Sequence, residues 1–142
     1  MKKNNKGFTL AELLIVVAII AVLVAIAIPV FQTRLEQSRE TTDIANLRSA
    51  YAAGQVAALS GDENGSVYAD GTYAYAPDDK DGIASSGAKI GRGTGTEGKA
   101  DSSALPSSII KYSGGNDVRQ KEIKIVFSSG TVTTVGFDGF MS

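Results

Sequence analysis

The feature that most constrains this chain is an uninterrupted apolar run close to its N-terminus. Every residue from 13 to 28 is Leu, Ile, Val or Ala. With the flanking apolar residues up to Phe31, the run is long enough, at about 1.5 Å per helical residue, to cross a hydrocarbon core of about 30 Å. One carboxylate, Glu12, lies at its start, although an unpaired carboxylate in hydrocarbon costs about 2.5–3.5 kcal/mol. Glu12 must therefore lie at the interface, find a partner, or have a role that outweighs this cost.

The charges around the run predict its orientation. Lys2, Lys3 and Lys6 precede it, and the next cation is Arg34. Because cationic flanks favour the cytoplasmic side, we expect a single-pass protein of the cytoplasmic membrane with its N-terminus in the cytoplasm. A cleaved secretory signal is the alternative, but its apolar core would be only about 7–15 residues long, and no small-x-small signature follows Pro29. We therefore expect the run to be retained.

Composition excludes several classes of chemistry. The chain has 142 residues, with 14 cationic and 15 anionic side chains, no histidine and no cysteine. This excludes disulfides, Ser-His-Asp triads and zinc sites built on imidazole or thiolate. The balanced charge gives no indication of a nucleic-acid partner. A membrane-anchored enzyme is the least favoured interpretation, because no catalytic constellation can be assembled, and no cofactor is expected.

The apolar run is predicted to be the first half of one long helix. Pro29 is expected to kink this helix, as membrane helices tolerate. Gly61 is expected to end it, because glycine readily adopts the left-handed conformation of a helix C-cap.

The second half of the helix is predicted to be amphipathic. Its apolar stripe recurs at three- and four-residue spacing: Ile44, Ala45, Leu47, Tyr51, Ala52, Val56 and Leu59. Its charged residues are expected on a mostly solvated face: Arg34, Glu36, Arg39, Glu40, Asp43 and Arg48.

The middle of the chain, 61–108, is predicted to be mainly loop, since it holds nine of the 16 glycines. Short aromatic pieces at 67–68 and 72–75 are expected to dock onto the fold or form brief strands. The stretch GRGTGTEG, 91–98, lacks the context and the lysine of a phosphate-binding loop and is interpreted as flexible loop. Asp78, Asp79 and Asp81 loosely resemble part of a calcium loop, but the spacing fails the full pattern, and a solvated acidic turn is favoured.

The last third reads as strands at 109–112, 122–128 and 131–137, the second with apolar residues alternating along one face. Ser129-Gly130 is a two-residue hairpin connection that would pair Phe127 with Val132. A three- or four-stranded antiparallel sheet laid on the amphipathic half of the helix would bury both apolar faces. The predicted fold class is therefore α+β.

The hexapeptide GFTLAE, residues 7–12, settles the class when it is taken with the apolar run that follows. It resembles the class III signal of type IV pilins and of the pilin-like proteins of type II secretion and DNA-uptake machines. In that family a short basic leader ends in Gly, Phe-Thr-Leu usually follows, and a Glu is the fifth residue after the cut. Ala11 stands where Val is commoner, and Pro29 falls where many pilins carry a proline. The close match covers roughly the first 30 residues.

This resemblance implies roles for three residues. A prepilin peptidase would cut between Gly7 and Phe8, and the new amine of Phe8 would be N-methylated. Glu12 would pair with the Phe8 amine of an adjacent subunit and fix its axial register during assembly. The implied division of the chain is a leader at 1–7, a transmembrane and filament-core helix at 8–31, the amphipathic half of that helix at 32–60, a loop region at 61–108 and a β-sheet at 109–142.

The resemblance further implies a structural protein rather than an enzyme. The expected product is a type IV pilin, held in membrane lipid as a prepilin and polymerised into an extracellular helical filament of identical subunits, used for adhesion, motility or DNA uptake. The implied partners are the prepilin peptidase and methyltransferase, a pilus assembly ATPase, a membrane platform protein and minor pilins. The alternative is a pseudopilin of a type II secretion or competence pseudopilus.

Overall fold

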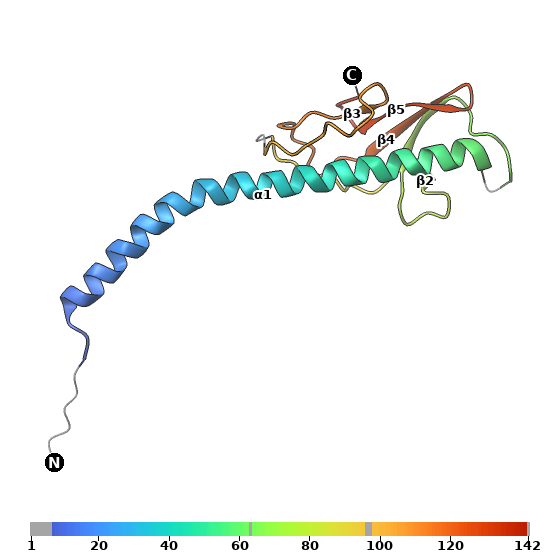
Figure 1. The fold of residues 1–142 in the computed structure, drawn as a ribbon. Helices are drawn as coiled ribbons and strands as arrows, with labels where there is room; N and C mark the ends of the chain where they lie inside the picture. Colours follow the sequence, from blue (N-terminus) through green and yellow to red (C-terminus); the bar gives the residue numbers. More distant parts are fainter. Residues whose placement is uncertain (1–6, 63, 96–97, 142) are drawn as a thin grey trace, which may run out of the picture. The chain divides into compact units, whose positions relative to one another are not determined.

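The computed structural model describes residues 7–62, 64–95 and 98–141. The chain divides into two compact units that meet between Arg34 and Leu35, and each is described by itself. In the described residues, one helix precedes five strands: α1 (Leu10–Ser60), β1 (Gly71–Tyr75), β2 (Ile83–Ala84), β3 (Ile110–Lys111), β4 (Ile123–Ser128) and β5 (Thr131–Phe137) (Figure 1). The predicted α+β class is confirmed.

The described part of the first unit is mostly the apolar part of α1. Its large side chains have no partners within the unit to bury them: Phe8 is 85% exposed and Val24 is still 45% exposed. The most apolar 18-residue window of α1 has a mean hydropathy of 3.4, so by length and composition the helix can cross a membrane. Pro29 lies inside α1, which continues through it. The kink predicted at Pro29 stays a prediction.

The second unit contains a five-stranded sheet in the order β2-β1-β4-β5-β3. Three of its pairings are antiparallel, and β3 runs parallel to β5. The sheet is therefore mixed and larger than the antiparallel sheet that the sequence predicts. The glycine-rich middle of the chain supplies β1, which occupies the free edge of β4. On the other side of the β4–β5 hairpin, β3 pairs with β5.

The predicted hairpin between β4 and β5 is confirmed. Phe127 pairs with Val132, and Ser128 pairs with Thr131. Ser129 and Gly130 both have positive φ, 52° and 73°, as a two-residue hairpin turn of the right twist requires. The register shifts between Val126 and Phe127, where the partner strand carries one extra residue.

The core of the second unit lies between the sheet and the second half of α1. The helix contributes Ile44, Leu47, Ala50 and Ala57, and these pack with apolar side chains of β4 and β5. Val56 and Leu59, expected in the stripe, are instead 62% and 89% exposed. Each residue turns a helix by about 100°, so Val56 and Leu59, one and two residues from the buried Ala57, point away from the core.

The end of α1 and the aromatic pieces follow the sequence predictions. Gly61 has a φ of 73°, and its N–H donates to the carbonyl of Ala57 at 2.9 Å, so the predicted glycine cap is confirmed. Tyr68 stacks on Phe127 with ring centroids 5.4 Å apart, and Tyr73 meets Phe127 edge-on at 5.5 Å. These rings dock the glycine-rich segment onto the sheet.

Candidate functional site

The start of α1 is closed by two reciprocal hydrogen bonds. The backbone N–H of Thr9 donates to Oε2 of Glu12 at 2.8 Å, and the N–H of Glu12 donates to the hydroxyl oxygen of Thr9 at 3.3 Å. This is a capping box, in which the residue before the helix and the third helical residue satisfy each other's backbone donors. The capping box was not predicted, although the Thr-x-x-Glu spacing before an apolar run is its sequence signature.

The capping box gives Glu12 a local role. Its negative charge lies in the first turn, where the positive end of the helix dipole favours it. Phe8 and Gly7 lie just before the box. Both are exposed, and a side chain added at Gly7 would meet no atom within 4 Å. The peptide between Gly7 and Phe8 is thus unobstructed within the described chain.

A second polar cluster lies in the second unit and was not predicted. Glu36, Glu40 and Asp43 were expected on a solvated face, but they are only 3%, 1% and 0% exposed. Their spacing of four and three residues places them on one face of α1. We call these three side chains the carboxylate row. The partners of the row lie far along the chain, mainly in residues 91–95 and 98–100, which we call the strap.

Asp43 and Glu36 hold the first piece of the strap. Asp43 accepts the N–H groups of Arg92 and Gly93, both at 2.8 Å. Glu36 accepts the N–H of Thr94 at 2.6 Å and its hydroxyl at 2.7 Å, and it pairs with Arg39 at 3.2 Å. The flexible loop expected here is therefore tied to the helix.

The pKa values of Asp43 and Glu36 are shifted in opposite directions, although burial acts to raise both. Burial raises the pKa of Asp43 above its ordinary value, because the N–H bonds from Gly93 and Arg92 only partly offset it. Burial also acts to raise the pKa of Glu36. There, the hydrogen bonds from Thr94 and Arg39 together outweigh burial, and the pKa of Glu36 is lowered.

Glu40 holds two separate segments. It accepts the N–H groups of Gly98 and Ala100 from the strap, at 2.9 and 3.0 Å. It also accepts the N–H of Gly115, at 3.2 Å, from the turn formed by residues 113–116. Every buried side-chain polar atom in the described ranges has a hydrogen-bond partner. Burial of the carboxylate row therefore leaves no side-chain oxygen of the row without a hydrogen bond.

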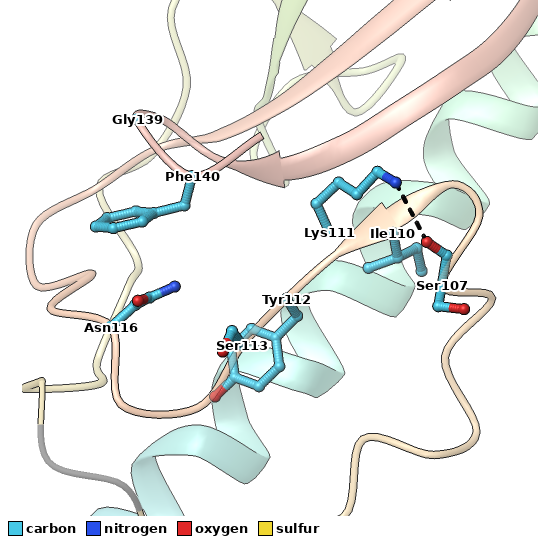
Figure 2. Close-up of a pocket in the computed structure, with 8 residues that line it drawn as sticks. All are labelled: Ser107, Ile110, Lys111, Tyr112, Ser113, Asn116, Gly139 and Phe140. Atoms are coloured by element: carbon cyan, nitrogen blue, oxygen red, sulfur yellow. Dashed lines mark hydrogen bonds between the residues drawn. The ribbon is translucent and has the colours of Figure 1, made fainter. Parts of the chain in front are cut away.

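A pocket of about 280 Å³ lies beside that turn (Figure 2). Tyr112, Ser113 and Asn116 face Phe140 across it, while the ammonium of Lys111 is directed toward the carbonyl of Ser107 at 3.4 Å. Burial, and then the charges of the carboxylate row, raise the pKa of Tyr112, which keeps its hydroxyl protonated. The lining offers rings, hydroxyls and one amide.

The acidic turn between β1 and β2 is shaped by its own backbone. The N–H of Asp79 donates to the carbonyl of Ala76, and the N–H of Gly82 donates to that of Asp79. Asp81 accepts the hydroxyl of Tyr68 at 3.4 Å. Across residues 7–62, 64–95 and 98–141, no three acidic side chains gather where they would hold a metal ion. A calcium site at Asp78, Asp79 and Asp81 stays an untested idea.

Comparisons with known proteins point to one group of relatives. Residues 2–28 match the family model described as the prokaryotic N-terminal methylation motif. A fimbrial protein of Pseudomonas aeruginosa is 32% identical over 134 residues, which cover 81% of this chain and 82% of that protein. The type IV major fimbrial protein FimA of Dichelobacter nodosus is 44% identical over 71 residues, 48% of this chain and 44% of FimA.

A third relative aligns over a shorter stretch. The type IV major pilin protein PilA of Myxococcus xanthus is 55% identical over 53 residues, which are 35% of this chain and 23% of PilA. No solved structure matches the chain.

Proposed function

Since this chain belongs to the type IV pilin family, whose members are structural subunits and not enzymes, we propose that it is processed at Gly7 and assembled through its apolar helix into an extracellular pilus. The observation that carries this proposal is the GFTLAE hexapeptide at the start of an exposed apolar helix. A helix that exposes this much apolar surface needs lipid or other apolar helices around it. Membrane lipid before assembly, and neighbouring subunits afterwards, would meet this need.

Processing is proposed to remove residues 1–7 and leave the apolar helix in the product. Gly7 carries no side chain, so a peptidase can approach the extended backbone closely at the cut. The new N-terminus at Phe8 would then receive one methyl group. The match to the methylation motif over residues 2–28 supports this step.

The capping box is compatible with the proposed register role of Glu12. Oε2 of Glu12 accepts the backbone N–H of Thr9. Oε1 accepts no hydrogen bond from the residues that the structure describes. We propose that Oε1 accepts the Phe8 amine of an adjacent subunit. A carboxylate among apolar helices is costly alone, so pairing in one axial position favours that register over the others.

A pilus is favoured over a secretion or competence pseudopilus. The relatives are named fimbrial proteins and major pilins, and the alignment with the Pseudomonas fimbrial protein covers most of both chains. The proposed partners are further copies of the chain, the peptidase and methyltransferase, an assembly ATPase, a membrane platform protein and minor pilins. The precursor is proposed to cross the cytoplasmic membrane once, with its N-terminus inside. Residues 8–31 would form the filament core, and a bend at Pro29 would lead into the second unit.

Intact-mass measurement of filaments sheared from cells tests this function. The expected chain begins at Phe8 and carries one methyl group on its amine. A chain that begins at Met1, or after Pro29, would contradict the proposed processing. Recovery of the mature chain only from membranes, with no filament outside the cell, would favour the pseudopilus.

A further inference from the structure

The two pieces of the strap are anchored differently. The first piece, 91–95, is bound by backbone as well as by Asp43 and Glu36: the N–H of Val118 donates to the carbonyl of Gly93 at 3.0 Å. The second piece, 98–100, is bound to Glu40 through the N–H groups of Gly98 and Ala100. In the described chain these two amides make no backbone hydrogen bond. Loss of Glu40 would therefore free the second piece, whereas loss of Asp43 would leave the backbone bonds of the first.

Glu40 also joins the strap to a different part of the fold. The same oxygen, Oε1, accepts the N–H of Gly98 at 2.9 Å and the N–H of Gly115 at 3.2 Å. Ser113 and Asn116, from the turn that contains Gly115, line the pocket in Figure 2. One carboxylate thus connects the strap, the helix and a wall of the pocket.

Glycines allow both segments to come this close. A Cβ at Gly114 would lie 2.9 Å from Oε1 of Glu40, and a Cβ at Gly98 would overlap the helix backbone at Glu36 and Gln37. A side chain at Gly98 would push its segment away from the helix backbone, and a side chain at Gly114 would move either the turn or the Glu40 carboxylate out of its present position. This observation is independent of the hydrogen bonds, and it shows that glycine lets the strap lie against the helix backbone and lets the turn lie against the Glu40 carboxylate.

Apolar packing contributes little to holding the strap. Of its two described pieces, the second brings only Ala100, partly buried, to the core cluster, and the first brings no residue. A glycine-rich segment also loses more backbone entropy on ordering than other sequences do. Attachment of the strap therefore depends on its polar bonds, and segments held in this way open locally while a packed core stays closed.

We propose that Glu40 links residues 98–100 to the 113–116 turn, so that the two segments detach from α1 and reattach as one unit. The sheet and the helix stay packed during this opening. The wall of the pocket thus moves whenever the strap is released.

Amide hydrogen exchange of the full-length chain in detergent, resolved by NMR, tests the proposal. In Glu40→Gln the side-chain NH₂ group replaces one carboxylate oxygen and would face backbone N–H donors, which it cannot accept. The remaining hydrogen bonds are no longer charge-assisted. Exchange of Gly98, Ala100 and Gly115 should accelerate together by about tenfold or more, while Ile125 and Val135 in the sheet keep their rates. Unchanged rates for the three amides would overturn the proposal. So would acceleration of the strap without Gly115, or an equal acceleration of the sheet.

Two further variants distinguish coupling of the strap and the turn through Glu40 from a general loss of stability. Asp43→Asn is the matched control, and it should accelerate Arg92 and Gly93 but leave Gly98, Ala100 and Gly115 near their original rates. Gly98→Ala keeps the carboxylate and displaces the strap, and it should accelerate Gly115, which the substitution does not touch. If Asp43→Asn freed all five amides equally, or if Gly98→Ala left Gly115 unchanged, the strap and the turn would not be joined through Glu40.

Discussion

Thr9 and Glu12 satisfy each other's backbone N–H groups at the start of α1, at 2.8 and 3.3 Å. The bonds place the carboxylate against its own helix end rather than in the surrounding apolar surface. The first N–H groups of a helix have no acceptors within the helix, and the capping box gives acceptors to two of them, those of Thr9 and Glu12. Glu12 thus has a structural role within one subunit, beside the role between subunits that we propose for it.

Replacing Thr9 tests the capping box. Thr9→Ala removes the hydroxyl acceptor and should destabilise the first helical turn by about 1 kcal/mol, whereas Thr9→Ser keeps the acceptor and should cost far less. The measurement is the backbone chemical shift of residues 10–12 in detergent. Equal helicity of this turn in the Ala and Ser variants would show that the box does not hold the helix start.

Replacing Asp43 tests how much the carboxylate row contributes to the stability of the second unit. Asp43→Ala leaves the N–H groups of Arg92 and Gly93 without their acceptor and should lower the free energy of unfolding by about 2–5 kcal/mol. Urea unfolding of the full-length chain, followed by tyrosine fluorescence, measures this change. Thr42→Ala, at an exposed position of the same helix, is the control and should change stability by less than about 0.5 kcal/mol. Similar midpoints for both variants would show that burial of Asp43 is incidental.

The opposed pKa shifts of Glu36 and Asp43 predict opposed effects on acid stability. Because the pKa of Glu36 is lowered by folding, its stabilisation is present above its ordinary value of 4.5 and is lost as pH falls through the lowered pKa. The pKa of Asp43 is raised, so its stabilisation is present below its ordinary value of 3.8 and is lost as pH rises through the raised pKa. Glu36→Gln should therefore flatten the loss of stability between about pH 5 and about pH 3, and Asp43→Asn should steepen it.

Stability curves of both variants against pH check these signs. Urea midpoints at several pH values, each compared with the parent chain, give the slopes directly. Parallel curves for the parent and Glu36→Gln would show that Glu36 titrates alike in the folded and unfolded chain.

Local patterns were sufficient for the parts of the fold that neighbouring residues determine. The glycine cap at Gly61 follows from one residue's conformational freedom, and the pairing of Phe127 with Val132 follows from the length of one turn. The resemblance at residues 7–12 likewise rests on a short continuous stretch. In each case the interacting residues are close together in the sequence.

The carboxylate row could not be predicted in this way. Glu36, Glu40 and Asp43 look like the solvated face of an amphipathic helix, because charged residues are rarely buried without partners. Their partners are backbone N–H groups some 50 to 75 residues further along the chain. A helix-period pattern does not show which distant loop will supply donors. The glycines at 93, 98 and 114, which let these loops approach, carry a signal only when they are read together with the acids.

The most direct test of the account concerns Glu12 in assembly. Glu12→Ala should leave membrane insertion and removal of the leader intact, since Gly7 and the basic residues are unchanged. Glu12→Gln is the matched variant, because it keeps hydrogen-bonding atoms but cannot neutralise an amine. The measurement is the amount of sheared filament relative to processed, membrane-bound chain in the same cells, with each variant expressed alone. We expect this ratio to fall by about tenfold or more in both variants, as a charge-assisted bond is lost, and a normal ratio in Glu12→Ala would contradict the register role.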